Sequence, residues 1–179
     1  TKAVQRTMDS GASTIYFPNR RYRVNGTVNV PASVERVTFL YGRLISGNKK
    51  KPAFRVTENA ETPLTFEDLR SRGMAWLFDH ASPRTVVMRH IGAQGYLYQN
   101  SNTERGVRAF FENVNGLGRT GDQFGAGQKV FARFINTEYK GGPNFYATDC
   151  DMWVMGFKVE GGSVNFWVDE GGRLEVLGG

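Results

Sequence analysis

The chain has few of the residues from which disulfide frameworks and zinc sites are built. It contains one cysteine, Cys150, and two histidines, His80 and His90, among 179 residues. A single cysteine excludes an internal disulfide, and two histidines ten residues apart without a cysteine partner make no recognisable zinc site. No stretch approaches the ~18 apolar residues that a spanning helix needs. We therefore predict no metal site and no membrane span.

Acidic residues are outnumbered by basic ones, with 17 Asp and Glu against 23 Lys and Arg and a net charge of +6. The basic residues cluster at positions 19–21, 49–51 and 70–72. A basic surface favours anionic partners such as acidic polysaccharide, nucleic acid or anionic lipid headgroups, and the alternative interpretation is three solvated loops. Because the chain has no recognisable nucleic-acid-binding module, we do not expect nucleic acid as a partner.

Glycine is abundant, and the C-terminal half contains a repeat of about 22 residues. Phe131 precedes Trp153 by 22 residues, Trp153 precedes Glu175 by 22, and Phe110 precedes Phe131 by 21. The 22 glycines, about 12% of the chain against a usual ~7%, suit frequent tight turns. A strand-and-turn unit at this period is typical of a solenoid with stacked coils. The repeat predicts an all-β, parallel β-helix (β-solenoid) of about 22 residues per coil.

One short helix is predicted before the strands. Val4 and Met8 lie one helical turn apart within residues 3–11, and Gly11 is a suitable stop. No interior linker is evident, so we expect residues 1–179 to form a single β-helix domain with this helix as its N-terminal cap. A solenoid needs a cap at each end. Since no second cap is evident, we expect a longer chain, or a partner that covers the C-terminal coil.

Alternation along the strands predicts which side chains point outward. With charged residues outside, the predicted outward set is Phe131, Arg133, Ile135, Trp153, Met155, Phe157, Glu175 and Leu177, and Phe134 points inward. Phe110, Phe131 and Trp153 then form an exposed aromatic ladder, which suits a bound sugar, a second subunit or further chain. A bend within a strand would reverse this alternation and return the rings to the core.

Two segments resemble a known family. The first contains Ala3-Val4-Gln5, Asp9-Ser10-Gly11, Thr14-Ile15-Tyr16-Phe17-Pro18, Tyr22-Arg23-Val24 and Val30-Pro31. The second contains Val130-Phe131-Ala132-Arg133, Asn136-Thr137-Glu138, residues 153–161 and residues 175–179. These segments resemble the pectate-lyase superfamily and bacterial proteins related to glycoside hydrolase family 28. Asn19-Arg20-Arg21 departs from the family pattern, in which glycine closely follows the first proline.

The resemblance implies a right-handed parallel β-helix in a secreted or cell-surface bacterial protein that is associated with carbohydrate. It implies binding, and either lyase or hydrolase cleavage, of an acidic polysaccharide, with Ca²⁺ as cofactor only in the lyase case. The superfamily also includes coils without known activity, so a structural or adhesive role in an extracellular or tailspike-like assembly stays open.

The repeat stacks one set of polar side chains that could act on a sugar. Glu138 and Glu160 are 22 residues apart, so they should lie one coil apart, about 4.8 Å. We predict these glutamates as the catalytic pair, because close carboxylates perturb each other and can act as acid and base. The predicted substrate-binding residues are Arg133, Asn136, Trp153 and Lys158. The alternative interpretation is a charged ladder at a turn, neutralised by neighbouring lysines.

Overall fold

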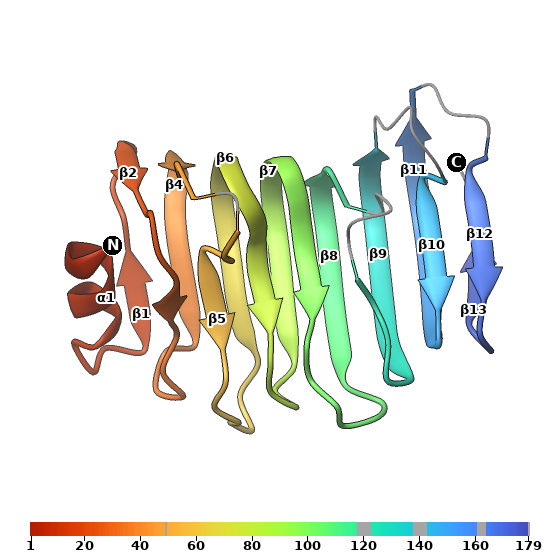
Figure 1. Cartoon of the computed structure of the whole chain (residues 1–179), viewed down its shortest axis with the longest axis horizontal. Helices are drawn as coiled ribbons and strands as arrows, with labels where there is room; N and C mark the ends of the chain where they lie inside the picture. The colour runs from red at the N-terminus through yellow and green to blue at the C-terminus, as the bar shows by residue number, and fades with distance from the viewer. Residues whose placement is uncertain (49, 118–122, 138–142, 161–163, 179) are drawn as a thin grey trace.

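The computed structural model describes residues 1–48, 50–117, 123–137, 143–160 and 164–178. These residues form one short helix followed by parallel strands that wind into a stack of coils, with the helix at one end (Figure 1). The predicted all-β parallel β-solenoid with a single short N-terminal helix is therefore confirmed. None of the described helices is long and apolar enough to cross a membrane.

The helix and strands have the following bounds. They are α1 (Lys2–Met8), β1 (Thr14–Tyr16), β2 (Arg21–Arg23), β3 (Val28–Asn29), β4 (Arg36–Ile45), β5 (Phe54–Val56), β6 (Leu64–His80), β7 (Val86–Asn100), β8 (Arg108–Asn115), β9 (Gln128–Thr137), β10 (Phe145–Thr148), β11 (Cys150–Val159), β12 (Phe166–Asp169) and β13 (Arg173–Val176).

Successive coils pair in parallel, in the order β1-β4-β6-β7-β8-β9-β11-β13. Phe131 lies opposite Trp153 and Trp153 lies opposite Glu175, as the repeat predicts. One coil is longer, because Arg36 lies opposite Thr65, 29 residues further along the chain. The period of about 22 residues therefore holds across the stack, with a single insertion between β4 and β6.

Each coil has three faces, which we define by the strand segments that pair with one another. The first face comprises 14–16, 36–38, 64–67, 86–89, 108–112, 128–133, 150–155 and 173–176. The second face comprises 21–23, 43–45, 69–72, 91–94, 114–115, 135–137 and 157–159. The third face comprises 28–29, 54–56, 78–80, 98–100, 145–148 and 166–169.

A corner residue with a left-handed backbone separates the first face from the second. In five consecutive coils this residue is Asp68 (φ 58°), His90 (φ 53°), Asn113 (φ 50°), Phe134 (φ 54°) and Gly156 (φ 70°). The corner adds one position to the strand, so the alternation of side chains shifts by one beyond it. Phe134 is consequently 63% exposed and Ile135 is buried, the reverse of the prediction, and Phe157 packs against the core.

The two ends of the stack differ in how the core is covered. At the N-terminal end α1 buries Val4 and Met8 against the first coils. At the other end, β12 and β13 form the last coil of the described chain. Val168 and Val176 lie in register with the fully buried Ala147 and Val154, yet they are 46% and 38% exposed. The helix therefore covers one end of the core, and the other end is open.

Candidate functional site

A column of polar side chains runs along the second face, one residue in each coil. Its members are paired in register from β2 to β11: Arg21, Arg43, Arg70, Gly92, Asn115, Asn136 and Lys158. We call these residues the polar column. Neighbouring members are one strand apart, about 4.8 Å along the stack. The predicted stacking of Asn136 on Lys158, and of Asn115 on Asn136, is part of this column.

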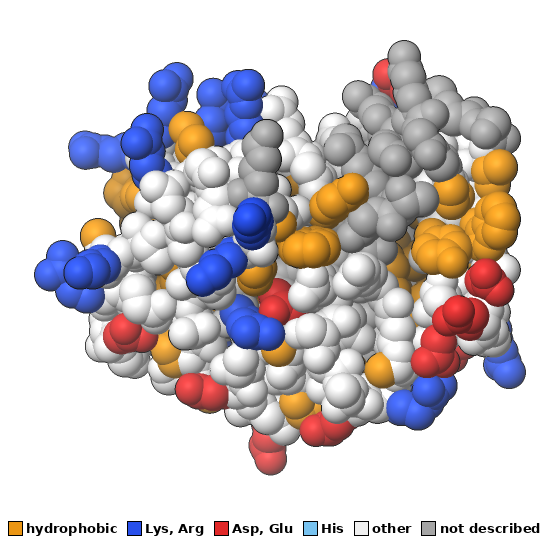
Figure 2. Space-filling model, viewed as in Figure 1, with side chains coloured by type: hydrophobic (Ala, Val, Ile, Leu, Met, Phe, Trp, Pro, Cys, Tyr) orange, Lys and Arg blue, Asp and Glu red, His pale blue; other side chains and the backbone are white. Residues whose placement is uncertain are grey.

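The N-terminal part of the polar column is strongly basic. Arg21, Arg43 and Arg70 are all exposed, and Arg23 and Arg72 lie two residues further along their strands on the same face. None of these five arginines forms an ion pair with a carboxylate in the described part of the chain. Figure 2 shows lysine and arginine side chains gathered at this end of the stack, over β2 and β4.

The basic part of the column opens into a groove of about 410 Å³. Gly92 lies between Arg70 and Asn115 in register and has no side chain, so it forms a low point of the groove. A Cβ atom at Gly92 would lie 3.9 Å from the Cγ of Arg70, an ordinary contact, and the backbone there does not require glycine. Arg72 and Gln94, which are paired in register, also line the groove.

Glycine is required by the backbone at the turn that closes this face. Gly73 has φ +81°, and a Cβ atom there would lie 2.3 Å from the carbonyl oxygen of Ser46. Gly116, one of the next glycines in the stack, has φ +97°, and its Cβ would lie 2.7 Å from the carbonyl oxygen of Ala93. These close backbone contacts fix the end of the second face and hold Arg72 and Gln94 in register.

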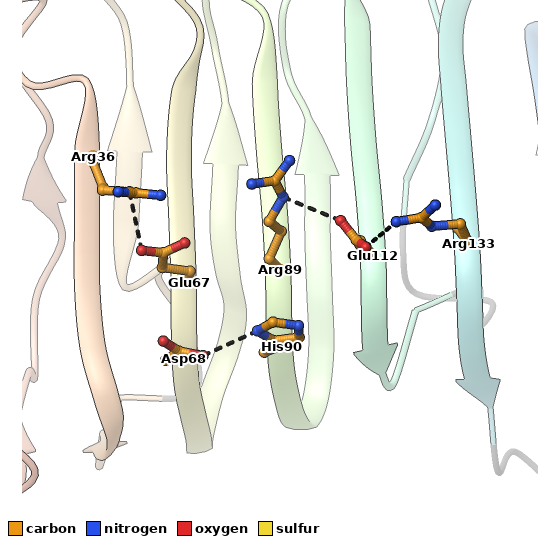
Figure 3. Close-up of polar contacts among 7 residues, drawn as sticks. All are labelled: Arg36, Glu67, Asp68, Arg89, His90, Glu112 and Arg133. Carbon is orange, nitrogen blue, oxygen red and sulfur yellow. Dashed lines mark hydrogen bonds and ion pairs between the residues drawn. The ribbon is translucent and has the colours of Figure 1, made fainter.

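The first face carries charges that neutralise one another. Glu112 lies between Arg89, at 3.2 Å, and Arg133, which donates a short hydrogen bond to it (Figure 3). The hydrogen bond from Arg133 holds the pKa of the Glu112 carboxyl below its usual value. Arg133, predicted to bind substrate, is thus paired with a carboxylate of its own chain.

The same charge pairing recurs elsewhere on the first face and at its corner. Arg36 pairs with Glu67 at 3.0 Å, and the corner residues Asp68 and His90 are 3.1 Å apart (Figure 3). The opposite signs of charge alternate from strand to strand, in contrast to the arginines of the second face. The two faces therefore differ in electrostatic character: the first is balanced and the second is basic.

The aromatic ladder also lies on the first face. Phe110 and Phe131 stack at 4.8 Å with an interplanar angle of 13°, and Phe131 and Trp153 stack at 4.8 Å with an angle of 8°. All three rings are half-buried and border a mainly apolar groove of about 430 Å³. Since stacked rings cover each other's faces, the ladder presents mainly ring edges to the solvent.

The structure describes one of the two predicted catalytic residues. Glu160 is exposed and forms a short ion pair with Lys158. Glu138 lies outside the described residues. Asn136 and Lys158 lie in the polar column, whereas Arg133 and Trp153 lie on the first face, across the corner at Phe134 and Gly156. The predicted site residues are therefore divided between two faces.

A buried polar cluster was not predicted as a site. The Nδ1 atom of His80 lies 2.5 Å from the Tyr98 hydroxyl, and the Gln128 side-chain amide donates to that hydroxyl at 2.6 Å. The Nε2 atom of His80 lies 2.6 Å from the carbonyl oxygen of Arg84. Burial lowers the pKa of His80 to about 4 and raises that of Tyr98. All these side chains are fully buried, so the cluster links the faces inside the coil.

In comparisons with protein-family models, curated proteins and solved structures, nothing matched this chain. Among the residues that the structure describes, no group of three or more His, Cys, Asp and Glu side chains could hold a metal ion. The evidence for function is therefore the geometry of the site, in which the arginines of the polar column had no signal in the 22-residue repeat.

Proposed function

We propose that this protein binds an acidic polysaccharide along the polar column of the second face. The observation that carries the proposal is the set of exposed arginines without carboxylate partners in the described part of the chain: Arg21, Arg23, Arg43, Arg70 and Arg72. Like charges on adjacent strands destabilise a sheet. A polymer with regularly spaced carboxylates would relieve this repulsion, since arginine pairs with carboxylates through two parallel hydrogen bonds.

The rest of the column supports a sugar in preference to other polyanions. Asn115 and Asn136 continue the column beyond the arginines, and Gln94 lines the same groove. Side-chain amides both donate and accept hydrogen bonds, which suits sugar hydroxyl groups. Single-stranded nucleic acid is usually held by aromatic rings on which its bases stack, and no member of the polar column is aromatic. The resemblance to the pectate-lyase superfamily agrees with a carbohydrate partner outside the cell.

The proposal concerns binding and does not include cleavage. Glycoside hydrolysis uses two carboxyl groups on either side of the scissile bond. Of the predicted pair, Glu160 is engaged by Lys158, and Glu138 lies outside the described residues. The basic groove lies several coils away from Glu160, between β4 and β8. Binding by the arginines therefore does not depend on these glutamates.

The test is a binding titration with polygalacturonate, with dextran as the uncharged polymer. The variant carries Arg43→Gln, Arg70→Gln and Arg72→Gln, and the matched control is Arg108→Gln, an exposed arginine on the first face. Since a hydrogen bond to a charged group contributes about 1.5–3 kcal/mol, we expect the triple variant to bind at least about tenfold more weakly. Its affinity should also depend less on salt, while Arg108→Gln binds like the parent.

Two results would contradict the proposal. One is a parent protein that binds neither polygalacturonate nor another polyuronate above the level of dextran. The other is a triple variant that binds as tightly as the parent. A parent that prefers double-stranded DNA at equal charge concentration would move the assignment to a different polyanion.

A further inference from the structure

The last coil exposes two strand edges at the same end of the stack. Among the described strands, β13 pairs only with β11, and β12 pairs only with β10 (Figure 1). The free edge of a strand presents N–H and C=O groups that can pair with another chain. Long edges of this kind are usually shortened, twisted away or covered in soluble proteins. The open edges are therefore a candidate interaction surface.

The core beneath these edges is uncovered as well. Val168 and Val176 point inward in register with buried residues, yet they are 46% and 38% exposed. Leu177 and Trp167, on the same coil, are each 49% exposed. Figure 2 shows hydrophobic side chains gathered over β12 at this end. A partner that covers the coil would remove this apolar surface from water, at about 25 cal/mol for each Å² buried.

We infer that a second copy of this chain covers the open end, and that the two copies meet about a two-fold axis with β13 antiparallel to its counterpart. A head-to-tail stack would require the open end of one copy to meet the N-terminal end of the next. That end is covered by α1, whose Val4 and Met8 are buried in the core. The open end can therefore pair with its own kind, which closes the assembly at two copies.

The charges of β13 are complementary to themselves in this arrangement. Leu174 faces the core, and the outward Arg173 and Glu175 lie on either side of it. If the two-fold axis passes through Leu174, Arg173 lies directly opposite Glu175 of the second copy, and Glu175 lies opposite Arg173 of the second copy. Opposite charges at directly opposed positions stabilise an antiparallel pair, and like charges destabilise it. The sequence of β13 thus fits one register of self-pairing.

The experiment measures the mass of the protein in solution by sedimentation velocity. The parent is expected to be a dimer. In Arg173→Glu and in Glu175→Arg each pair across the axis becomes like-charged, so we expect each variant to dimerise at least about tenfold more weakly. An equimolar mixture of the two variants pairs glutamates with arginines again, and we expect it to restore a heterodimer.

Restoration by mixing also shows that each variant is folded. The matched control is Arg108→Glu, which lies in the same outward register as Arg173 but three coils inside the stack, and it should leave the parent dimer intact. A monomeric parent would overturn the inference and would leave the open end to a different partner or to further chain. A dimer that survives both single changes, or a mixture that stays monomeric, would also overturn it. Polyuronate binding uses another face and is expected in every variant.

Discussion

Arg43 and Arg70 lie directly opposite each other on the adjacent parallel strands β4 and β6, and both side chains are exposed. Arg21 lies opposite Arg43 on the other side, so three arginines follow one another across three coils. In the described part of the chain no carboxylate neutralises them. On the first face, each of Arg36, Arg89 and Arg133 has a glutamate partner. The fold thus tolerates repulsion on one face, which we attribute to binding.

Removing one arginine of the polar column should stabilise the free protein. We expect Arg70→Gln to raise the free energy of unfolding by about 0.2–1 kcal/mol, because a like-charge pair on adjacent strands is lost. With saturating polygalacturonate the order should reverse, since the parent gains more from the ligand. Urea denaturation with and without the polymer measures both effects. Arg36→Gln is the matched control, because it loses an ion pair with Glu67 and should be unchanged or up to about 1 kcal/mol less stable.

Filling the low point of the groove should abolish binding without unfolding the protein. Gly92→Glu places a carboxylate between Arg70 and Asn115, where it can pair with the arginine in place of a uronate. The backbone at Gly92 accepts a Cβ, so Gly92→Ala should fold and bind like the parent. Gly73→Ala serves as the structural contrast and should lose about 1–3 kcal/mol of stability, because its Cβ meets the Ser46 carbonyl. Titration and urea denaturation separate the two effects, and a Gly92→Glu protein that binds normally would exclude this groove.

The repeat was sufficient to predict the coil period, the parallel pairing and the register of Phe131, Trp153 and Glu175. It could not show the corners, because the left-handed position is held by chemically unrelated residues, among them His90 and Phe134. Glycine would have marked such a position, but in the repeated segments it does so only at Gly156 and Gly178. The alternation of side chains was therefore predicted correctly before the corner and wrongly after it.

The arginine column was hidden by the insertion between β4 and β6. Arg21 and Arg43 are 22 residues apart, but Arg43 and Arg70 are 27 apart, so a fixed period does not align them. The basic clusters at 19–21 and 70–72 were visible, yet only the structure places members of both on one face. Asn136 and Lys158 were found because their part of the chain keeps the regular period.

The buried His80 should make the fold less stable in mild acid. Its pKa is lowered from 6.5 to about 4 by burial, so between these pH values the unfolded chain binds a proton that the folded chain does not. Stability should be fully present above pH 6.5 and fall as the pH drops toward 4. The loss over this range is about 3 kcal/mol. Urea denaturation at several pH values measures it.

The two histidines provide the control for this pH dependence. His80→Gln removes the titrating group, so its unfolding free energy should vary little between pH 6.5 and 4, although its stability is lower throughout. His90 is exposed beside Asp68, and His90→Gln should keep the fall in stability seen in the parent. A parent whose stability is flat over this range would mean that His80 takes up its proton without unfolding.

The stacked rings of the first face should contribute to stability as a coupled unit. Phe131 and Trp153 stack at 4.8 Å with nearly parallel planes, and such pairs contribute about 0.5–1.5 kcal/mol beyond the area that they bury. A double-mutant cycle with Phe131→Leu and Trp153→Leu, measured by urea denaturation, should give a coupling energy of this size. Tyr146 and Trp167, whose centroids are 6.5 Å apart with planes tilted by 59°, form the comparison pair and should couple less.

The same variants decide which face binds the polymer. Because the faces of the rings are occupied by one another, we expect Trp153→Leu to lower stability and leave polygalacturonate binding unchanged. Trp153 was predicted to bind substrate, so the opposite result is informative: lost binding at unchanged stability would place the sugar on the first face. Arg133 would then have to exchange its Glu112 partner for a uronate. An unchanged affinity in Trp153→Leu, together with a loss in the triple arginine variant, would assign the polymer to the second face alone.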